Sequence, residues 1–182
     1  MGVKVGIVIY CILQFIAFLF LLVGTPIDMF RAKNEDTIGN KPCLTMWGTK
    51  EKCYSTKYDI RPDDLFVLCK ERRDRFRAAE AFAIIHIVVY LVACILGFVQ
   101  LCCCSCLRWA CLALNILGIT SCISWAIMAD LYLRNSSASL TWSGSPNCYK
   151  FNLAFKYGAG FGLLVTAWCL NIVAMVFLML PC

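Results

Sequence analysis

The chain has 182 residues, 61% of them hydrophobic, with a mean hydropathy of +0.74 and a formal net charge of +6. This hydropathy is well above that of an ordinary soluble domain. Most charged residues gather in one segment and form no basic stripe interleaved with aromatic residues, which argues against nucleic acid as a partner. The apolar residues lie in four long uncharged runs. They predict an all-α bundle of four transmembrane helices in the lipid bilayer.

The first uncharged run covers residues 5–23, which is long enough to cross the hydrocarbon layer as a helix. It exceeds the roughly 7–15 residues of a signal-peptide core, and no small-x-small cleavage pattern follows it, so we expect a retained span. The other three spans are expected at about 81–101, 109–129 and 157–180. Residues 1–182 then form a single domain.

Three connections join these spans: a long polar loop at 24–80, a tight turn at 102–108 and a second loop at 130–156. The short turn predicts that the second and third spans are antiparallel neighbours. The charged residues 70–77 have helical spacing, with Glu71 four positions before Arg75, and are expected to begin the second span as an exposed stalk.

Cys43 and Cys53 bracket a short polar stretch in the first loop, and a disulfide between them would close a hairpin. Gly48 would occupy its turn, where a positive φ costs glycine little. Strand-forming residues lie around this hairpin and predict a small antiparallel β-sheet; they are Leu44, Met46, Tyr54, Thr56, Tyr58 and, after Pro62, residues 65–68.

The charges of the loops and their chemistry favour opposite orientations. The first loop carries twelve Lys and Arg residues against Lys4 and Arg108 on the other face, which by the positive-inside rule alone would place the loops in the cytosol. The close cysteine pair favours an oxidising space, and Asn135 begins an N-glycosylation acceptor. On the opposite face lies a juxtamembrane palmitoylation candidate, Cys102, Cys103, Cys104 and Cys106. We therefore expect a multi-pass membrane protein with outer loops and both termini cytosolic.

Four cysteines fall on the loop side, Cys43, Cys53, Cys69 and Cys148, and allow three disulfide connectivities. We favour Cys43–Cys53 with Cys69–Cys148, because the second bond would tie the two loops together. Metal-binding thiols would need a histidine or a second close pair, and the only histidine, His86, lies within the second span. No metal site and no cofactor are therefore expected.

Several polar residues lie inside the spans, where they are costly: Gln14, His86, Gln100, Asn115, Ser124, Thr166 and Asn171. His86 and Gln100 fall within about 40° of each other on an ideal helix, which would suit a polar path or an interhelical hydrogen bond. Gly158 and Gly162 form a Gly-x-x-x-Gly pair for close helix packing, within the bundle or with a second copy in a homo-oligomer. No catalytic motif is present, so we expect no enzymatic activity.

The stretch between the paired cysteines resembles the signature of the amastins, surface glycoproteins of trypanosomatid parasites. The residues that carry this resemblance are Cys43, Leu44, Thr45, Met46, Trp47, Gly48, Lys50 and Cys53. Size, four spans and two unequal loops extend the resemblance over the whole chain. The paired cysteines and Trp47-Gly48 are also distantly similar to claudin-type proteins, whose first loop forms a small sheet on a helical bundle.

The resemblance implies a non-enzymatic plasma-membrane protein of the parasite's intracellular stage. We predict that the stapled first loop acts in host–parasite membrane contact, adhesion or lateral assembly, with a host membrane or host surface protein as partner. Trp47 is expected to pack against the sheet and the membrane interface. The alternative is a small ion, proton or solute transporter that uses the polar residues inside the bundle.

Overall fold

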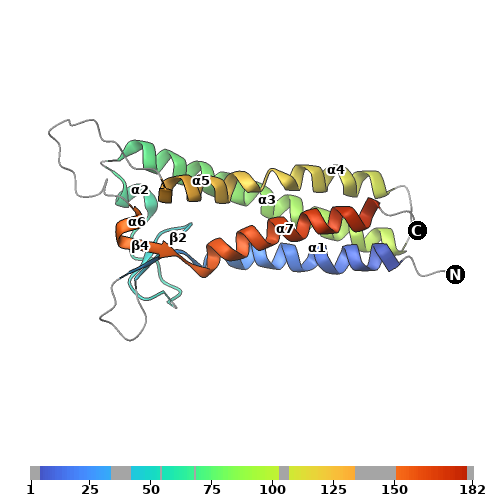
Figure 1. Cartoon of the computed structure of the whole chain (residues 1–182), viewed down its shortest axis with the longest axis horizontal. Helices are drawn as coiled ribbons and strands as arrows, with labels where there is room; N and C mark the ends of the chain where they lie inside the picture. The colour runs from blue at the N-terminus through green and yellow to red at the C-terminus, as the bar shows by residue number, and fades with distance from the viewer. Residues whose placement is uncertain are drawn as a thin grey trace.

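The computed structural model describes residues 5–33, 42–53, 55–67, 69–102, 107–133 and 151–179. Long helices run side by side along the molecule, and a small sheet caps one end of the bundle (Figure 1). Helix α1 begins and helix α7 ends at the opposite end. We call these two regions the sheet end and the termini end.

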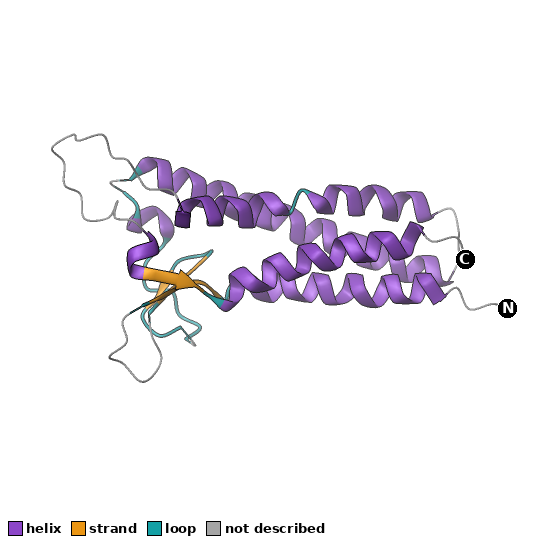
Figure 2. Ribbon diagram, in the orientation of Figure 1, coloured by secondary structure: helices purple, strands orange, loops and turns teal. Residues whose placement is uncertain are grey.

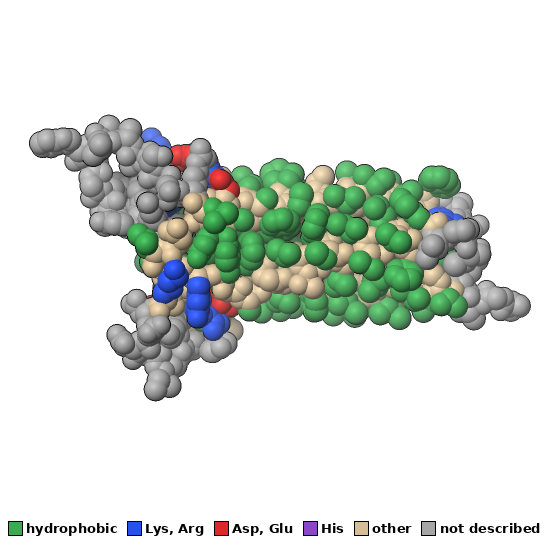
Figure 3. Space-filling view, viewed as in Figure 1, with side chains coloured by type: hydrophobic (Ala, Val, Ile, Leu, Met, Phe, Trp, Pro, Cys, Tyr) green, Lys and Arg blue, Asp and Glu red, His purple; other side chains and the backbone are tan. Residues whose placement is uncertain are grey.

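Five long helices build four spans. They are α1 (Val5–Gly24), α3 (Lys70–Cys102), α4 (Arg108–Ile119), α5 (Cys122–Leu133) and α7 (Ala159–Met179). Helices α4 and α5 together form the third span, so four helical segments are long and apolar enough to cross a membrane. Hydrophobic side chains cover their flanks, whereas most charged side chains visible in Figure 3 lie near the sheet end.

The sheet contains β1 (Asp28–Ala32), β2 (Cys43–Thr45), β3 (Thr49–Lys50) and β4 (Phe155–Tyr157) in the spatial order β3-β2-β1-β4, all antiparallel (Figure 2). The first three strands come from the first loop and the fourth comes from the second loop. Two short helices, α2 (Pro62–Leu65) and α6 (Phe151–Ala154), lie beside the sheet. The fold is thus a four-span bundle with a disulfide-stapled sheet, an arrangement of the claudin type.

One hydrophobic core joins the sheet to the bundle. Met29 and Phe30 of β1 belong to the same buried cluster as Phe76 of α3, Met128 of α5 and Leu164 of α7. Burying one such side chain contributes about 1.5–3 kcal/mol, so this shared cluster orients the sheet on the helices.

The predicted strand at residues 65–68 is wrong over its described part, because Leu65 ends α2 and Phe66 and Val67 form a turn; Leu68 lies outside the described residues. Pro62 occupies the start of this helix, and Asp63 and Asp64 fall in its first turn. Proline suits a first helical position and carboxylates suit the positive end of the helix dipole. The predicted strand residues Thr56 and Tyr58 are also outside any strand, and Tyr54 lies outside the described residues.

The structure has three features that the sequence did not predict. Strand β1 follows α1 after three residues, and β4 contains the last two residues of the predicted second loop and Tyr157, the predicted start of the fourth span, which begins instead at Ala159. The third span is not continuous, because it breaks at Thr120 and Ser121 between α4 and α5.

Glycines allow the fourth span to lie against the sheet and the first span. A Cβ at Gly158 would collide with the carbonyl and carboxylate oxygens of Asp28, and one at Gly160 would lie 2.6 Å from the Gly24 carbonyl oxygen. A Cβ at Gly162 would meet nothing within 4 Å. Gly158 therefore packs against β1, and Gly162 faces outward from the chain.

We predict that Gly158→Ala lowers the free energy of unfolding by about 1–3 kcal/mol, because a methyl group there must displace the β1 backbone. Thermal unfolding of the detergent-purified protein measures the effect. Gly162→Ala is the matched control and should change stability by no more than about 0.5 kcal/mol, since its methyl group enters open space. Equal effects from the two substitutions would contradict this account of Gly158.

Candidate functional site: the stapled sheet and its turn

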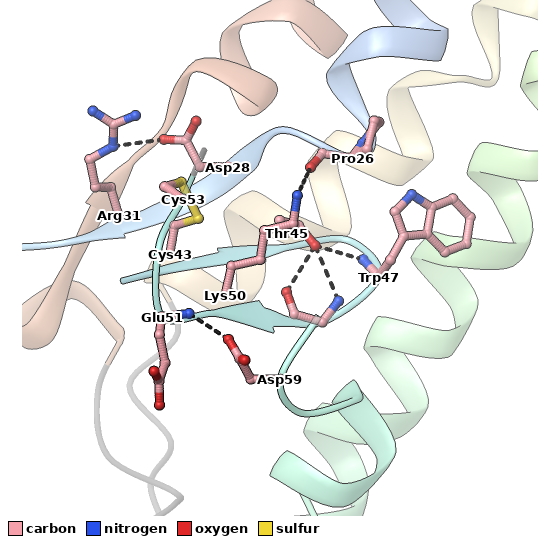
Figure 4. The surroundings of a disulfide bond; sticks show 11 residues. Pro26, Asp28, Arg31, Cys43, Thr45, Trp47, Lys50, Glu51, Cys53 and Asp59 are labelled. Atoms are coloured by element: carbon pink, nitrogen blue, oxygen red, sulfur yellow. Dashed lines mark hydrogen bonds and ion pairs between the residues drawn. A yellow bond between two sulfur atoms is a disulfide. The ribbon is translucent and has the colours of Figure 1, made fainter. Parts of the chain in front are cut away.

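A disulfide closes the hairpin of β2 and β3. Cys43 begins β2 and Cys53 follows β3, with their Cα atoms 5.4 Å apart (Figure 4). Closing a loop of about ten residues contributes roughly 3 kcal/mol in the chain-entropy account. Cys69 is also disulfide-bonded. Its predicted partner, Cys148, lies outside the described residues, so that pairing stays a prediction.

Thr45 organises the turn between β2 and β3. Its hydroxyl accepts hydrogen bonds from the backbone N–H groups of Trp47 and Gly48, both at 3.1 Å, and donates to the Gly48 carbonyl at 2.8 Å (Figure 4). The Thr45 backbone N–H also donates to the Gly48 carbonyl, at 2.9 Å. A buried hydroxyl thus satisfies backbone groups that a turn leaves without ladder partners.

Gly48 is required by both backbone conformation and space. Its φ is +152°, and a Cβ there would lie 2.6 Å from the Ile60 carbonyl oxygen. This carbonyl accepts a hydrogen bond from the Thr49 N–H at 2.9 Å, and the Asp59 N–H donates to the Thr49 carbonyl at 3.0 Å. A side chain at position 48 would therefore push the 59–60 segment away from β3.

Lys50 is a buried cation that links three parts of the first loop. Its side chain is 7% exposed, and its Nζ donates to the Pro26 carbonyl at 3.3 Å and lies 4.7 Å from the centre of the Tyr58 ring. A carbonyl dipole and an aromatic face are both suited to an ammonium group. The basic position of the signature thus connects β3 to Pro26, in the short link between α1 and β1.

The apolar residues of the signature point inward. Leu44 and Met46 are buried in the shared core, and Trp47 packs against that core while remaining half-buried. In Figure 4 the Trp47 indole lies on the side of the helices, away from the disulfide. The apolar side chains of the signature therefore stabilise the packing of the sheet on the helices.

Ion pairs connect the charged parts of the sheet end. Arg77 of α3 donates to Asp63 of α2 at 2.6 Å, and Arg75 joins α3 to Asp130 of α5. The hydrogen bond from Arg77 lowers the pKa of the Asp63 carboxyl below its usual value. The stabilisation of the fold by this ion pair is complete above the pKa that the Asp63 carboxyl has in the unfolded chain. It is lost only as the pH falls through the lower pKa of the folded protein. The pair therefore stays ionised in mildly acidic solution.

His86 and Gln100, the two polar residues that were predicted to share a helix face, are both buried on α3. The His86 Nε2 lies 2.9 Å from Thr120 Oγ1 at the break of the third span, and its Nδ1 contacts the Phe82 carbonyl. Gln100 is buried nearer the termini end of α3, fourteen positions further along, and no contact joins it to His86 in the described part of the chain.

The remaining predicted site residues fall at or beyond the edges of the described structure. Cys102 is exposed at the last position of α3. Cys103, Cys104, Cys106 and Asn135 lie outside the described residues, so palmitoylation and glycosylation stay predictions. Within the described ranges, no group of three or more His, Cys, Asp or Glu side chains is arranged to hold a metal ion.

The match to a known family agrees with this geometry. The family model of the amastin surface glycoproteins matches residues 15–178. The chain belongs to the amastin family. The match contains the signature turn, all four strands, the second and third spans, nearly all of the fourth span and the second half of the first span of this amastin. No curated protein and no solved structure matches the chain.

Sequence reasoning missed one polar contact in the sheet and one inside the spans. Asp28 is buried in β1 and accepts from the Arg31 Nε at 3.0 Å, and the Trp168 Nε1 donates to the Ile119 carbonyl at 3.0 Å at the helix break. An aspartate three positions before an arginine was a usable local signal. The Trp168 contact joins residues 49 positions apart and had no local signal.

We predict that Thr45→Val destabilises the sheet end by about 1–3 kcal/mol, because it removes the hydroxyl that accepts from two turn N–H groups. Thermal unfolding and the rate of proteolysis within the first loop measure the change. Thr49→Val is the matched control, since the Thr49 hydroxyl makes only an exposed 3.4 Å contact with the Ile60 carbonyl. If the Thr45 and Thr49 variants behave alike, the proposed role of the Thr45 hydroxyl is wrong.

Proposed function

We propose that this amastin is a non-enzymatic plasma-membrane surface protein that acts through its sheet end in host–parasite membrane contact, adhesion or lateral assembly. The observation that carries the proposal is a set of exposed apolar side chains on a firmly supported platform. Among the described residues beyond the spans, Ile60, Val67 and Leu153 are large, apolar and 45–67% exposed. Exposed apolar side chains outside the spans are available for contact with membranes or proteins, and apolar surface is typical of such contact sites.

The platform beneath these side chains is held at several points. The disulfide, the Lys50 contacts and the pairing of β1 with β4 tie both loops together, and the shared core fixes them to the helices. A pre-ordered surface loses little conformational entropy on binding, which favours its use as a contact surface. The closed Cys43–Cys53 bond supports an outward orientation of the sheet end, with both termini cytosolic.

Two of these side chains offer a direct test of this surface. Ile60 is 45% exposed, and Leu153, in α6, is 67% exposed. We predict that the double variant Ile60→Asn and Leu153→Asn reduces attachment of amastin proteoliposomes to host-cell membranes by about tenfold or more, because burying one such side chain contributes about 1.5–3 kcal/mol.

Flotation of fluorescent proteoliposomes with isolated host plasma membrane measures this attachment. Thr56→Asn, at an exposed polar position, is the control for surface changes that remove no apolar area. Chemical crosslinking within one membrane separates lateral assembly from attachment to the host. Attachment and crosslinking at wild-type levels in the double variant would overturn the assignment of this surface.

The transport of an ion, proton or polar solute is the second candidate, and the break in the third span favours it. Discontinuous spans whose ends lie at mid-membrane recur at the binding sites of transporters. Here the break lies beside His86, whose ring contacts Thr120. This candidate predicts that His86→Gln or Gln100→Leu abolishes flux in liposomes while delivery to the surface is retained. Purified wild-type protein that shows no flux of protons, ions or small solutes would eliminate it.

A further inference from the structure

Three carboxamide side chains lie fully buried in the middle of the bundle. Gln14 is the tenth of the twenty residues of α1, Asn115 lies in α4 and Asn171 lies in α7, and all three are 0% exposed. No position of α1 or α7 carries a charged side chain. We refer to Gln14, Asn115 and Asn171 as the amide cluster.

Part of the amide cluster is directly hydrogen-bonded. The Asn115 Nδ2 donates to the Tyr10 hydroxyl at 2.9 Å and to the Cys111 carbonyl at 2.7 Å. The Asn171 Nδ2 donates to the Asn115 backbone carbonyl at 3.1 Å. These bonds link α1, α4 and α7 at one depth and use the donor side of both asparagine amides.

The packing of α1 against α7 places Gln14 at the same depth. A Cβ on Gly24 would lie 3.1 Å from the Leu163 Cβ, and near the other end Tyr10 shares a buried cluster with Ala174. The two helices are antiparallel and rise by the same distance per residue. Gly24 contacts α7 at residues 160–163, so Gln14, ten residues before Gly24, lies at the depth of residues 170–173 of α7. Gln14 therefore lies level with Asn171, on the face of α1 that also carries Tyr10 one turn away.

Four amide atoms of this cluster have no hydrogen-bond partner within the described part of the chain. They are the Gln14 Oε1 and Nε2, the Asn115 Oδ1 and the Asn171 Oδ1. An unsatisfied polar group in the hydrocarbon layer costs several kcal/mol. Four such atoms together would cost about as much as the whole stability of a typical domain. A polar ligand that bonds these atoms would remove this cost.

The unpartnered atoms indicate the chemistry of this ligand. Three are acceptors and one is an NH₂ donor, and a water molecule donates two hydrogen bonds and accepts two. A cation does not suit this site, because amide oxygens would surround it but no carboxylate would neutralise its charge. Helices α1 and α7 carry no charged side chain, and the only charged residue of α4 is Arg108, two turns before Asn115. An uncompensated charge at mid-membrane is strongly disfavoured.

We propose that Gln14, Asn115 and Asn171 form a binding site for water at the centre of the bundle. Bound water bridges the Gln14 amide of α1 to the amide oxygens of α4 and α7 and completes their hydrogen bonding. Gly118 keeps room for this arrangement, because a Cβ there would lie 3.0 Å from both terminal atoms of the Asn171 amide. The site depends on neither candidate function above.

Hydroxyl-radical footprinting tests this site, because X-ray pulses generate radicals from bound water and label the side chains beside it. The full-length protein in lipid nanodiscs is irradiated, and labelling is mapped by mass spectrometry. Tyr10 is the reporter and Phe76 is its control, since both are fully buried aromatic residues and Phe76 packs among apolar side chains. We expect Tyr10 to be labelled at a rate close to that of the exposed Tyr58, and Phe76 an order of magnitude more slowly.

A pair of matched variants assigns the labelling to the amide cluster. Gln14→Met removes the amide at nearly constant volume and should lower Tyr10 labelling to the level of Phe76. Thr166→Val removes a polar group on α7 whose hydroxyl already donates to the Gly162 carbonyl at 2.8 Å, and it should leave Tyr10 labelling unchanged. The comparison of Tyr10 with Phe76 in the wild type decides the proposal even where a variant fails to fold. Slow labelling of Tyr10 in the wild type, or labelling unaffected by Gln14→Met in folded protein, would overturn it.

Discussion

Strand β1 is the element on which the organisation of the sheet end depends. It pairs with β2 on one edge and with β4 on the other, so it joins a loop that follows the first span to a loop that precedes the fourth. The Gly158 N–H donates to the Met29 carbonyl at 2.8 Å, and α7 then turns away along α1. Because β1 follows α1 after only a few residues, the closest helix pair and the sheet form one continuous unit.

A second constraint acts inside the spans, where every polar group needs a partner from the protein or from bound water. The break at Thr120 and Ser121 frees carbonyl groups of α4, and side chains of other spans bind them. Trp168 of α7 donates to the Ile119 carbonyl, and the Tyr90 hydroxyl of α3 contacts the Gly118 carbonyl at 3.5 Å and the Ser121 hydroxyl at 3.2 Å. The break is thus an integrated feature of the bundle, surrounded on three spans by polar contacts.

The sequence predicted those features that depend on local chemistry. Long uncharged runs predicted four spans, and the paired cysteines with Gly48 between them predicted the stapled hairpin. It did not predict β1 or β4, because Asp28–Ala32 shows no clear alternation and Phe155–Tyr157 is only three residues long. Nor did it predict the break in the third span, which contains no proline and depends on Trp168 and Tyr90 from distant parts of the chain.

The signature residues that identify the family are not the residues that are exposed for contact with a partner. Thr45, Gly48 and Lys50 direct their polar groups to the turn, to the 59–60 segment and to Pro26, while Leu44 and Met46 fill the core. Side chains that are committed to internal contacts have little surface left for a partner. The signature therefore specifies the platform, and the chemistry of contact falls to exposed residues outside it, such as Leu153 in the second loop. A chain can then change what it binds without changing the residues by which its family is recognised.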